Sequence, residues 1–512
     1  MDKTSRPNIL LITSDQQHWN TIGLKNPEIH TPNLDRLAQR GCLFKRAYCP
    51  NPTCTPTRAS IITGMYPSQH GAYSLGTNLM ENHASVGEVL TNEGYHTALV
   101  GKAHFQPLRS SDEFPSLESY PILRDLDFWR KFDRTFYGFE RAELARNHAD
   151  ETHAGQHYAI WMEENGLTDW AKHFQNTWGE FSFGEEASTP QYLTWDLPEK
   201  FHTNAWIAER SNALMEDYAE EGKPFFLWAS FFDPHPPYLV PEPWDKMYDP
   251  SKISVPQITP GEHDKNPEHF RKTQQRDPDF SDWEEPGGAT MHGCCSHLQT
   301  RDSLAKEIAV YFGMISCMDK YIGQILDKLD ELSLAENTLI VFTSDHGHFF
   351  GQHGLNAKGP FHYEDLIKVP FIASWPGKIE AGSESDAIQS LVDLAPTFLG
   401  AAEARIPAFM TGIDQSASWT RAAPPARDHA IVENRHQPTT LYPKTYIEQS
   451  YKITTYQGRE YGELFDLETD PDEVNNLWDD SQYATLKAEL MMEFFHAELR
   501  KEPTPMPRIA GA

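Results

Sequence analysis

The chain has 512 residues, of which 39% are hydrophobic and 23% are charged, as in an ordinary globular protein. Its formal net charge of −30 excludes the broad basic surface that nucleic-acid binding needs, so no nucleic-acid partner is expected. No run of about 18 apolar residues occurs, so no membrane partner is expected either. Six cysteines in so long a chain do not form a disulfide framework.

The start of the chain bears on its location. Residues 1–7 lead directly into a strand-like segment, and no apolar signal region precedes it. As printed, the chain is therefore expected to be cytoplasmic. It would be periplasmic or secreted if a leader had been removed.

Apolar runs and helical patterns alternate along most of the chain. Runs typical of buried parallel strands lie at residues 9–13, 97–100, 225–229, 339–343 and 371–374. Helical patterns lie between them, at residues 33–40, 86–92, 206–219 and 306–332. This alternation predicts an α/β fold with a doubly wound sheet, in which ligands bind beyond the carboxyl ends of the strands.

The chain divides into two predicted domains. Residues 1–424 are expected to form the large α/β domain, interrupted by long excursions at residues 106–200 and 240–300 that read as binding loops. After residue 425 the composition changes, and strand-like segments precede a helical pattern at residues 483–500. Residues 425–512 are therefore predicted to form a smaller α+β domain with a short antiparallel sheet.

Two of the predicted strands end in the same way. Both run from apolar residues into Thr-Ser-Asp, one ending at Asp15 and the other at Asp345. Because the carboxyl ends of neighbouring parallel strands meet at one edge of a sheet, these two carboxylates are expected to converge on a site.

Between them lies the pentapeptide Cys54-Thr55-Pro56-Thr57-Arg58, followed by a small, apolar run that ends in Thr63-Gly64. Proline fits the first turn of a helix, where its missing N–H costs nothing. Cys54 is therefore expected at a helix N-terminus, where free N–H groups and the helix dipole favour an anion. Arg58 lies one turn further on and can face the same group.

This pentapeptide and the run after it resemble the signature of the type I, formylglycine-dependent sulfatases of the alkaline phosphatase superfamily. The resemblance implies a large mixed, mostly parallel sheet sandwiched by helices, with a smaller C-terminal domain. It also implies that a formylglycine-generating maturation enzyme oxidises Cys54, whose hydrated aldehyde is then the nucleophile. A C-terminal run from Glu463 to Leu477 is similar to a structural motif of the same family.

The resemblance also implies a site for one divalent cation. Its ligands would be Asp15, Gln16, the modified Cys54, Asp345 and His346. The family usually uses calcium, which suits hard oxygen ligands, while manganese and magnesium stay open. Many members carry a second aspartate where this chain has Gln16, and the change removes one negative charge from the site.

Four further residues match family positions with catalytic roles. Gly101-Lys102-Ala103-His104 looks like a motif whose lysine contacts the nucleophile and whose histidine is the base that expels sulfate; alternation along an extended chain would put Lys102 and His104 on one side. His235, held among prolines, matches the histidine that protonates the leaving oxygen. Lys358 matches the lysine that binds the sulfate oxygens, and Arg58 would stabilise charge on the transferring group.

Three functions remain open. The first is hydrolysis of an organic sulfate. The substrate would be a sulfated small molecule or oligosaccharide, and a carbohydrate is favoured because the two excursions suit a large ligand. The second is hydrolysis of phosphonate monoesters or phosphate diesters, which members of the same superfamily perform and which Gln16 weakly favours. The third is a non-catalytic binding protein with an unmodified Cys54. A homo-oligomer is compatible with each of them.

Overall fold

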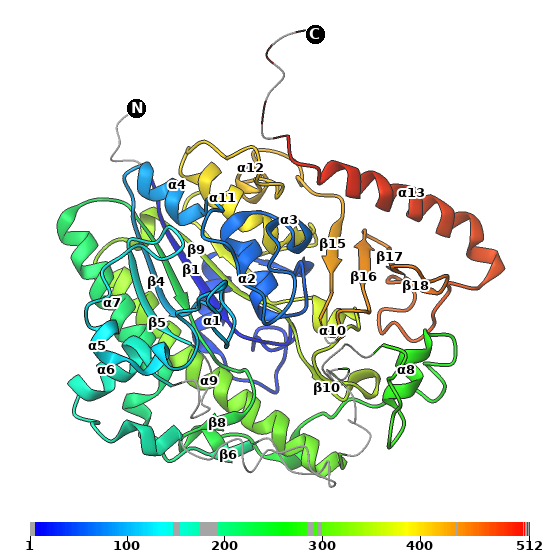
Figure 1. Ribbon diagram of the computed structural model, residues 1–512, viewed down its shortest axis with the longest axis horizontal. Coiled ribbons are helices and arrows are strands. Elements are labelled where there is room, and N and C mark those ends of the chain that lie inside the picture. Colours follow the sequence, from blue (N-terminus) through cyan, green and yellow to red (C-terminus); the bar gives the residue numbers. More distant parts are fainter. Residues whose placement is uncertain are drawn as a thin grey trace.

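The computed structural model describes residues 6–146, 154–174, 192–283, 299–436 and 438–504, with the single residues 291, 293, 506, 509 and 511. Its centre is an eight-stranded sheet in the spatial order β13-β2-β12-β9-β1-β7-β4-β5 (Figure 1). All five strands expected from the apolar runs lie in this sheet. In chain order, its strands are β1 (Asn8–Ser14), β2 (Cys42–Phe44), β4 (His96–Lys102), β5 (Arg141–Ala145), β7 (Phe225–Ser230), β9 (Thr338–Ser344), β12 (Phe371–Ser374) and β13 (Ser383–Ser385).

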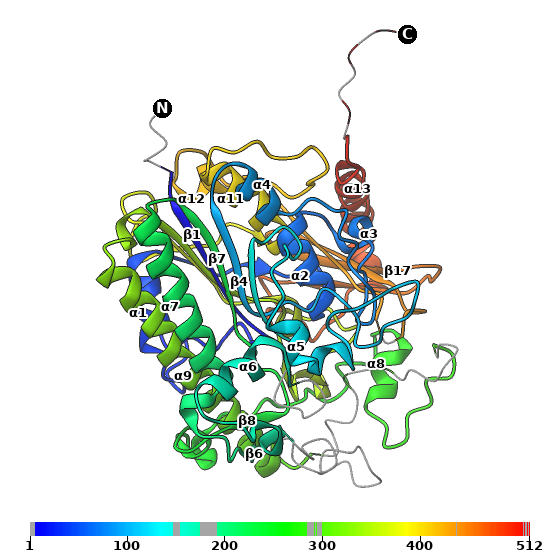
Figure 2. The same cartoon turned by 60° about the vertical axis from the view of Figure 1, so that its left-hand side comes forward.

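Helices cover both faces of the sheet (Figure 2). One face carries α1 (Pro32–Arg40), α7 (Thr203–Glu221) and α9 (Arg301–Glu331); the other carries α2 (Cys54–Thr63), α4 (Val86–Asn92) and α11 (Leu394–Ala401). Leu10 and Ile12 of β1 pack toward the first group, whereas Ile9 and Leu11 pack toward the second. Burial on both faces explains why this strand is a continuous apolar run and not an alternating one.

The central strands of the sheet are parallel, and their register determines where the candidate site lies. β1 runs parallel to β7 on one side and to β9 on the other, with Thr13 opposite Thr343 and Ser14 opposite Ser344. The two Thr-Ser-Asp sequences therefore end level with each other. β4 continues the parallel arrangement beyond β7, so that Lys102 at its end reaches the same edge.

One expectation about the sheet is wrong. The strand at residues 371–374 is present, but β12 runs antiparallel to both β9 and β2. Parallel neighbours need a crossover connection, usually a helix of several turns. Between β9 and β12 the only α-helix is the four-residue α10 (Glu364–Ile367), so the chain returns along the sheet in the opposite direction. The sheet is mixed and mostly parallel.

The first excursion, residues 106–200, is partly built into the fold. It contains α5 (Leu126–Trp129), α6 (Gln156–Glu164), β6 (Tyr192–Thr194) and the edge strand β5, which pairs with β4. Trp161, Trp170 and Trp195 are buried in the hydrophobic core, and Trp178 lies outside the described residues. The second excursion contains α8 (Glu268–Thr273), whose Phe270 packs against Phe361.

The C-terminal part forms a four-stranded antiparallel sheet of β15 (Ala430–Glu433), β16 (Pro443–Ile447), β17 (Tyr451–Tyr456) and β18 (Gly462–Asp466). Helix α13 (Ala484–Arg500) lies along its outer side and packs through Leu490 and Phe494 (Figure 1). This is the smaller α+β domain expected, while its boundary at residue 425 stays a prediction. Short elements complete the fold: α3 (Pro67–His70), α12 (Ser416–Trp419), β3 (Ala47–Tyr48), β8 (Tyr238–Val240), β10 (Phe349–Phe350), β11 (Asn356–Ala357) and β14 (Gln389–Ser390).

The described part of the chain has no helix that is both long and apolar enough to cross a membrane.

Candidate active site

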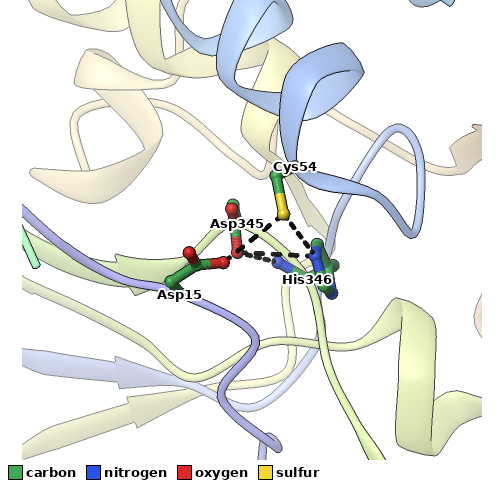
Figure 3. Close-up of side chains that lie close together, drawn as sticks. All are labelled: Asp15, Cys54, Asp345 and His346. Atoms are coloured by element: carbon green, nitrogen blue, oxygen red, sulfur yellow. Dashed lines mark hydrogen bonds and ion pairs between the residues drawn. The ribbon is translucent and has the colours of Figure 1, made fainter. Parts of the chain in front are cut away.

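Helix α2 carries Cys54 into the middle of the protein. The residue before it, Thr53, is extended, and the helix begins at Cys54, so Pro56 lies in the first turn as expected. All ten residues of α2 are buried. The Cys54 side chain points from this N-terminus toward Asp15, Asp345 and His346 (Figure 3).

The two strand-end carboxylates converge as the sequence predicts. Asp15 Oδ1 lies 3.5 Å from the sulfur of Cys54, and Asp15 Oδ2 forms an ion pair with Lys102. Asp345 Oδ2 accepts a 2.8 Å hydrogen bond from Arg58 Nε, and its Oδ1 accepts from the backbone N–H groups of Gln16 and His346. Each carboxylate is thus anchored through one oxygen by a buried cation.

Four residues form a cluster with the chemistry of a cation site. Ligand atoms of Asp15, Cys54, Asp345 and His346 all lie within 4.8 Å of one another, and all four residues are buried. His346 Nδ1 donates to the Gly347 carbonyl at 2.9 Å, which leaves the Nε2 lone pair facing Cys54 Sγ at 3.3 Å. Burial lowers the pKa of His346 to about 4, so the imidazole is neutral at pH 7 and can bind a metal. This donor set fits a divalent cation.

The thiol of Cys54 is not ionised at neutral pH. Burial first, and then the negative charge of Asp15, raise its pKa to about 11, and the charges of Lys102 and Lys358 do not offset them. A thiol is a weak nucleophile until it loses its proton. The unmodified cysteine is therefore poorly suited to attack a substrate.

Lys358 connects the cation cluster to His235. Its Nζ donates to Gln16 Oε1 at 2.9 Å and lies 3.5 Å from Cys54 Sγ and 3.4 Å from His235 Nε2. His235 donates through Nδ1 to the Pro236 carbonyl, so its Nε2 lone pair faces Lys358. His235 is the most exposed member of this group, which places it toward the solvent side of the site.

His104 reaches the site differently from the expectation. Strand β4 ends at Lys102, and His104 has φ of 57°, so the chain is not extended across the pair. The pKa of His104 is still held well below its ordinary value, first by burial and then by the charges of Arg146, Lys102 and Arg58. A neutral imidazole next to these cations can accept a proton.

The structure thus brings together the predicted residues Asp15, Gln16, Cys54, Arg58, Lys102, His104, His235, Asp345, His346 and Lys358. Four supporting residues were not predicted from the sequence: Ser230, Tyr238, Tyr311 and His348. They contact the predicted residues and hold them in place. Ser230 accepts from Arg58 and donates to the Lys102 carbonyl. Tyr238 had a signal, since it directly follows the prolines that hold His235, whereas His348 had none.

Aromatic side chains can stack on sugar rings, but those in and next to the first excursion are mostly enclosed. Trp206 and His202 are fully buried at the start of α7, and burial lowers the pKa of His202 to about 4. His157 is likewise buried for the most part, behind β5. The rings that would bind a substrate are therefore not identified by these positions.

Comparison with known proteins agrees with the geometry. The sulfatase family model matches residues 7–404, and a model of the C-terminal part of N-sulphoglucosamine sulphohydrolase matches residues 351–501. An arylsulfatase from Clostridium perfringens is 27% identical over 93% of this chain and 91% of its own. An N-acetylglucosamine-6-O-sulfatase from Bacteroides thetaiotaomicron is 26% identical over 96% of this chain and 86% of its own.

The fold also matches solved structures of the superfamily. The phosphonate monoester hydrolase of Agrobacterium radiobacter superposes with a TM-score of 0.77 at 23% identity, over 98% of this chain and 97% of that one. This likeness concerns the fold, whereas the family match spans more than half of the chain and includes every predicted site residue. The chain therefore belongs to the sulfatase family of enzymes, with the fold of the alkaline phosphatase superfamily.

Proposed function

We propose that this sulfatase removes sulfate from a sulfated carbohydrate, using a formylglycine made from Cys54 and one divalent cation. The observation that carries the proposal is the position of the Cys54 sulfur. It lies at the N-terminus of a buried helix, between Asp15 Oδ1 at 3.5 Å and His346 Nε2 at 3.3 Å, with Lys358 Nζ at 3.5 Å. An oxygen nucleophile at this position would lie at a helix N-terminus, next to Lys358 and next to a cation held by Asp15 and His346.

The state of the cysteine supports its conversion. With a pKa of about 11, the thiol carries little negative charge at neutral pH and has little value as a nucleophile. Formylglycine would supply an oxygen nucleophile in its place. A formylglycine-generating maturation enzyme is therefore a required partner in this proposal.

The cation would be held by Asp15, Gln16, Asp345 and His346 together with the modified Cys54. It would supply charge stabilisation and lower the pKa of the group it binds. Carboxylate and amide oxygens favour calcium, and the imidazole nitrogen and the single amide leave manganese and magnesium open.

The remaining residues have separable tasks. Arg58, Lys102 and Lys358 are buried cations that would bind and orient an anionic sulfate. His235 lies on the solvent side of the site, where the leaving oxygen would lie. In its imidazolium form, with the Nδ1 proton held by the Pro236 carbonyl, it would deliver the proton on Nε2 to that oxygen. His104 is neutral and enclosed, as a base that releases the product requires.

A sulfated sugar is the favoured substrate class because a relative named for N-acetylglucosamine-6-O-sulfate hydrolysis aligns over 96% of this chain. The direct test co-expresses the chain with a formylglycine-generating enzyme and offers it sulfated mono- and oligosaccharides, an aryl sulfate and a phenyl phosphonate ester. Sulfate release from the sugars is expected. Hydrolysis of the phosphonate alone would contradict the proposal.

The mass of the Cys54 peptide provides the control. Conversion to formylglycine lowers the mass by about 18 Da, and activity is expected to scale with the converted fraction. A protein that stays unconverted beside an active maturation enzyme, yet binds sulfated sugars without cleaving them, would be the binding protein considered above.

Phosphonate monoester hydrolysis is the second candidate. Its support is the close fold likeness to a phosphonate monoester hydrolase and the amide of Gln16 in the cation cluster. The phosphonate arm of the same assay tests it, and a kcat/KM for phenyl phosphonate above that for every sulfate would establish it.

A further inference from the structure

The side-chain amide of Gln16 is held between Lys358 and His348. Lys358 Nζ lies 2.9 Å from Gln16 Oε1, and Gln16 Nε2 lies 2.7 Å from His348 Nδ1. The two ends of a glutamine amide are hard to tell apart by shape, and their partners must assign them. An ammonium group can only donate, so the atom facing Lys358 is the carbonyl oxygen.

This assignment fixes the proton on His348. Its Nδ1 faces the NH₂ group of Gln16 and must accept, so the single ring proton of the imidazole is on Nε2. Nε2 then donates to the hydroxyl of Tyr238 at 2.8 Å. A chain of hydrogen bonds with one direction therefore runs from Lys358 through Gln16 and His348 to Tyr238.

The imidazole has little freedom to leave this arrangement. It stacks on Tyr311 with ring centroids 5.5 Å apart, and it meets the edge of Phe350 at 4.3 Å. His348 and Tyr311 are fully buried. Tyr311 also donates to the backbone carbonyl of Gln16 at 2.9 Å, so one aromatic cluster holds both the main chain and the side chain of this residue.

The backbone of Gln16 adds a second sign of constraint. Its φ of 60° lies in the left-handed region, which costs a non-glycine residue energy and persists only where neighbours enforce it. The backbone N–H of Gln16 donates to Asp345 Oδ1 at 2.9 Å. Four contacts, two to the backbone and two to the amide, thus determine where its amide points.

We propose that His348 and Tyr238 are positioning residues that keep the Gln16 carbonyl oxygen turned toward Lys358 and the cation cluster. Without an acceptor at His348 Nδ1, the amide can turn over and present its NH₂ group to Lys358 and to the cation. Both contacts would then be repulsive. The inference rests on the cation of the proposed function, and it assigns roles to two residues that would not touch that cation.

The test measures cation affinity directly, by calorimetric titration of calcium and manganese into chelator-stripped, full-length protein. His348→Leu is expected to weaken binding 10- to 100-fold, the usual effect of losing a partner that orients a metal ligand. His348→Asn should recover most of the affinity, because its Oδ1 can accept from Gln16. Tyr238→Phe removes one hydroxyl, should fold, and is expected to cause a smaller loss.

Two controls separate positioning from general damage. Tyr95→Phe removes a buried hydroxyl that donates to the Pro7 carbonyl at the opposite end of β1, and it should leave cation affinity unchanged. In a Gln16→Ala background, His348→Leu should cause no further loss, because its effect acts through the amide. An equal loss in both backgrounds would overturn the inference.

The same titration tests the proposed cation site and the proposed role of His348 and Tyr238 separately. If the unaltered protein binds neither cation, the cation of the proposed function is absent and the inference falls with it. If it binds a cation and the His348 and Tyr238 variants bind it equally well, the inference alone is wrong.

Discussion

Two histidines of the site have different environments, which suit them to the different tasks proposed for them. His104 is enclosed and surrounded by Arg58, Lys102 and Arg146, so its pKa is low and it can only accept a proton. His235 lies toward solvent, and its Nδ1 is committed to the Pro236 carbonyl. Its Nε2 lies 3.4 Å from Lys358 Nζ, and it would donate a proton to a leaving oxygen from the imidazolium form.

This difference predicts how His235→Ala divides substrates. Loss of a general acid typically costs on the order of 10²–10⁴-fold, and the cost falls where the leaving group is already stable without its proton. The variant is therefore expected to lose kcat/KM on sugar sulfates to that extent and far less on activated aryl sulfates. Steady-state kinetics on both substrates measures the ratio.

Lys358→Ala provides the matched comparison, because Lys358 contacts the same centre but would bind sulfate oxygens in every substrate. It should slow both substrate types by similar factors. Equal losses for His235→Ala would remove the general-acid role.

At this scale the sequence predicted the residues that carry chemistry better than the residues that hold them. Asp15 and Asp345 were predictable because parallel strands end at one edge of the sheet. His348 was not, because its task depends on the amide of a residue more than 300 positions away in the chain. Hydrogen bonds of this kind arise from packing and leave no spacing pattern in one sequence.

At the scale of elements, strand β4 requires a glycine at position 101. The resemblance of Gly101-Lys102-Ala103-His104 to a catalytic motif does not explain this requirement. Gly101 has φ of 110°, and a Cβ at this position would overlap the carbonyl oxygen of Ser230 on β7. The side chain that follows, Lys102, is the ion-pair partner of Asp15. The close approach of two backbones therefore sets the position of Lys102, a residue of the candidate site.

Gly101→Ala is expected to lower the free energy of unfolding by about 3 kcal/mol, since it adds both backbone strain and an overlap with fixed main chain. Gly94→Ala is the matched control, because Gly94 also has a positive φ of 90° but no atom within 4 Å of the added Cβ. It should cost only about 1 kcal/mol, from strain alone. Urea denaturation of both variants checks the difference, and equal losses would contradict the overlap.

Elements also show where sequence patterns stop being informative. Helix α13 and the central strands were predictable from their sequence patterns, since the helix is long and the strands are buried on both faces. The edge strand β5 was not, because its half-exposed sequence, RAELA, lacks an apolar run and lies inside a segment that reads as a loop. The direction of β12 depends on the length of its connection, which periodicity does not encode.

At the scale of the whole molecule, Glu433 joins three separate parts of the chain. It lies on β15 and accepts hydrogen bonds from the backbone N–H and the hydroxyl of Ser68 in α3. It also forms ion pairs with Lys501, after α13, and with Lys444. Burial alone would raise the pKa of Glu433, but Lys501 and Lys444 outweigh it and hold the pKa at about 2. The carboxylate thus ties the C-terminal domain to the large one.

A lowered carboxyl pKa stabilises the folded chain above its ordinary value of 4.5, and this contribution is lost as the pH falls toward 2. Glu433→Gln is therefore expected to lower stability by about 3 kcal/mol at pH 7 and to reduce the acid dependence between pH 4.5 and 2. Thermal unfolding across this range measures both effects. Glu489→Gln, on the exposed side of α13, should change neither, and an unchanged acid slope in Glu433→Gln would refute the role.

Removal of the cation should also lower the stability of the whole fold, because the cluster joins the ends of β1 and β9 to the first turn of α2. A ligand that binds only the folded chain stabilises it by about 2.7 kcal/mol at 100 times its Kd. Chelation is therefore expected to lower Tm, and restored calcium to raise it again with increasing concentration. The net charge of −30 attracts cations in general, so sodium at matched ionic strength is the necessary control. Asp345→Asn should abolish the calcium effect and keep the sodium effect; a calcium shift that survives in this variant would place the stabilising cation elsewhere.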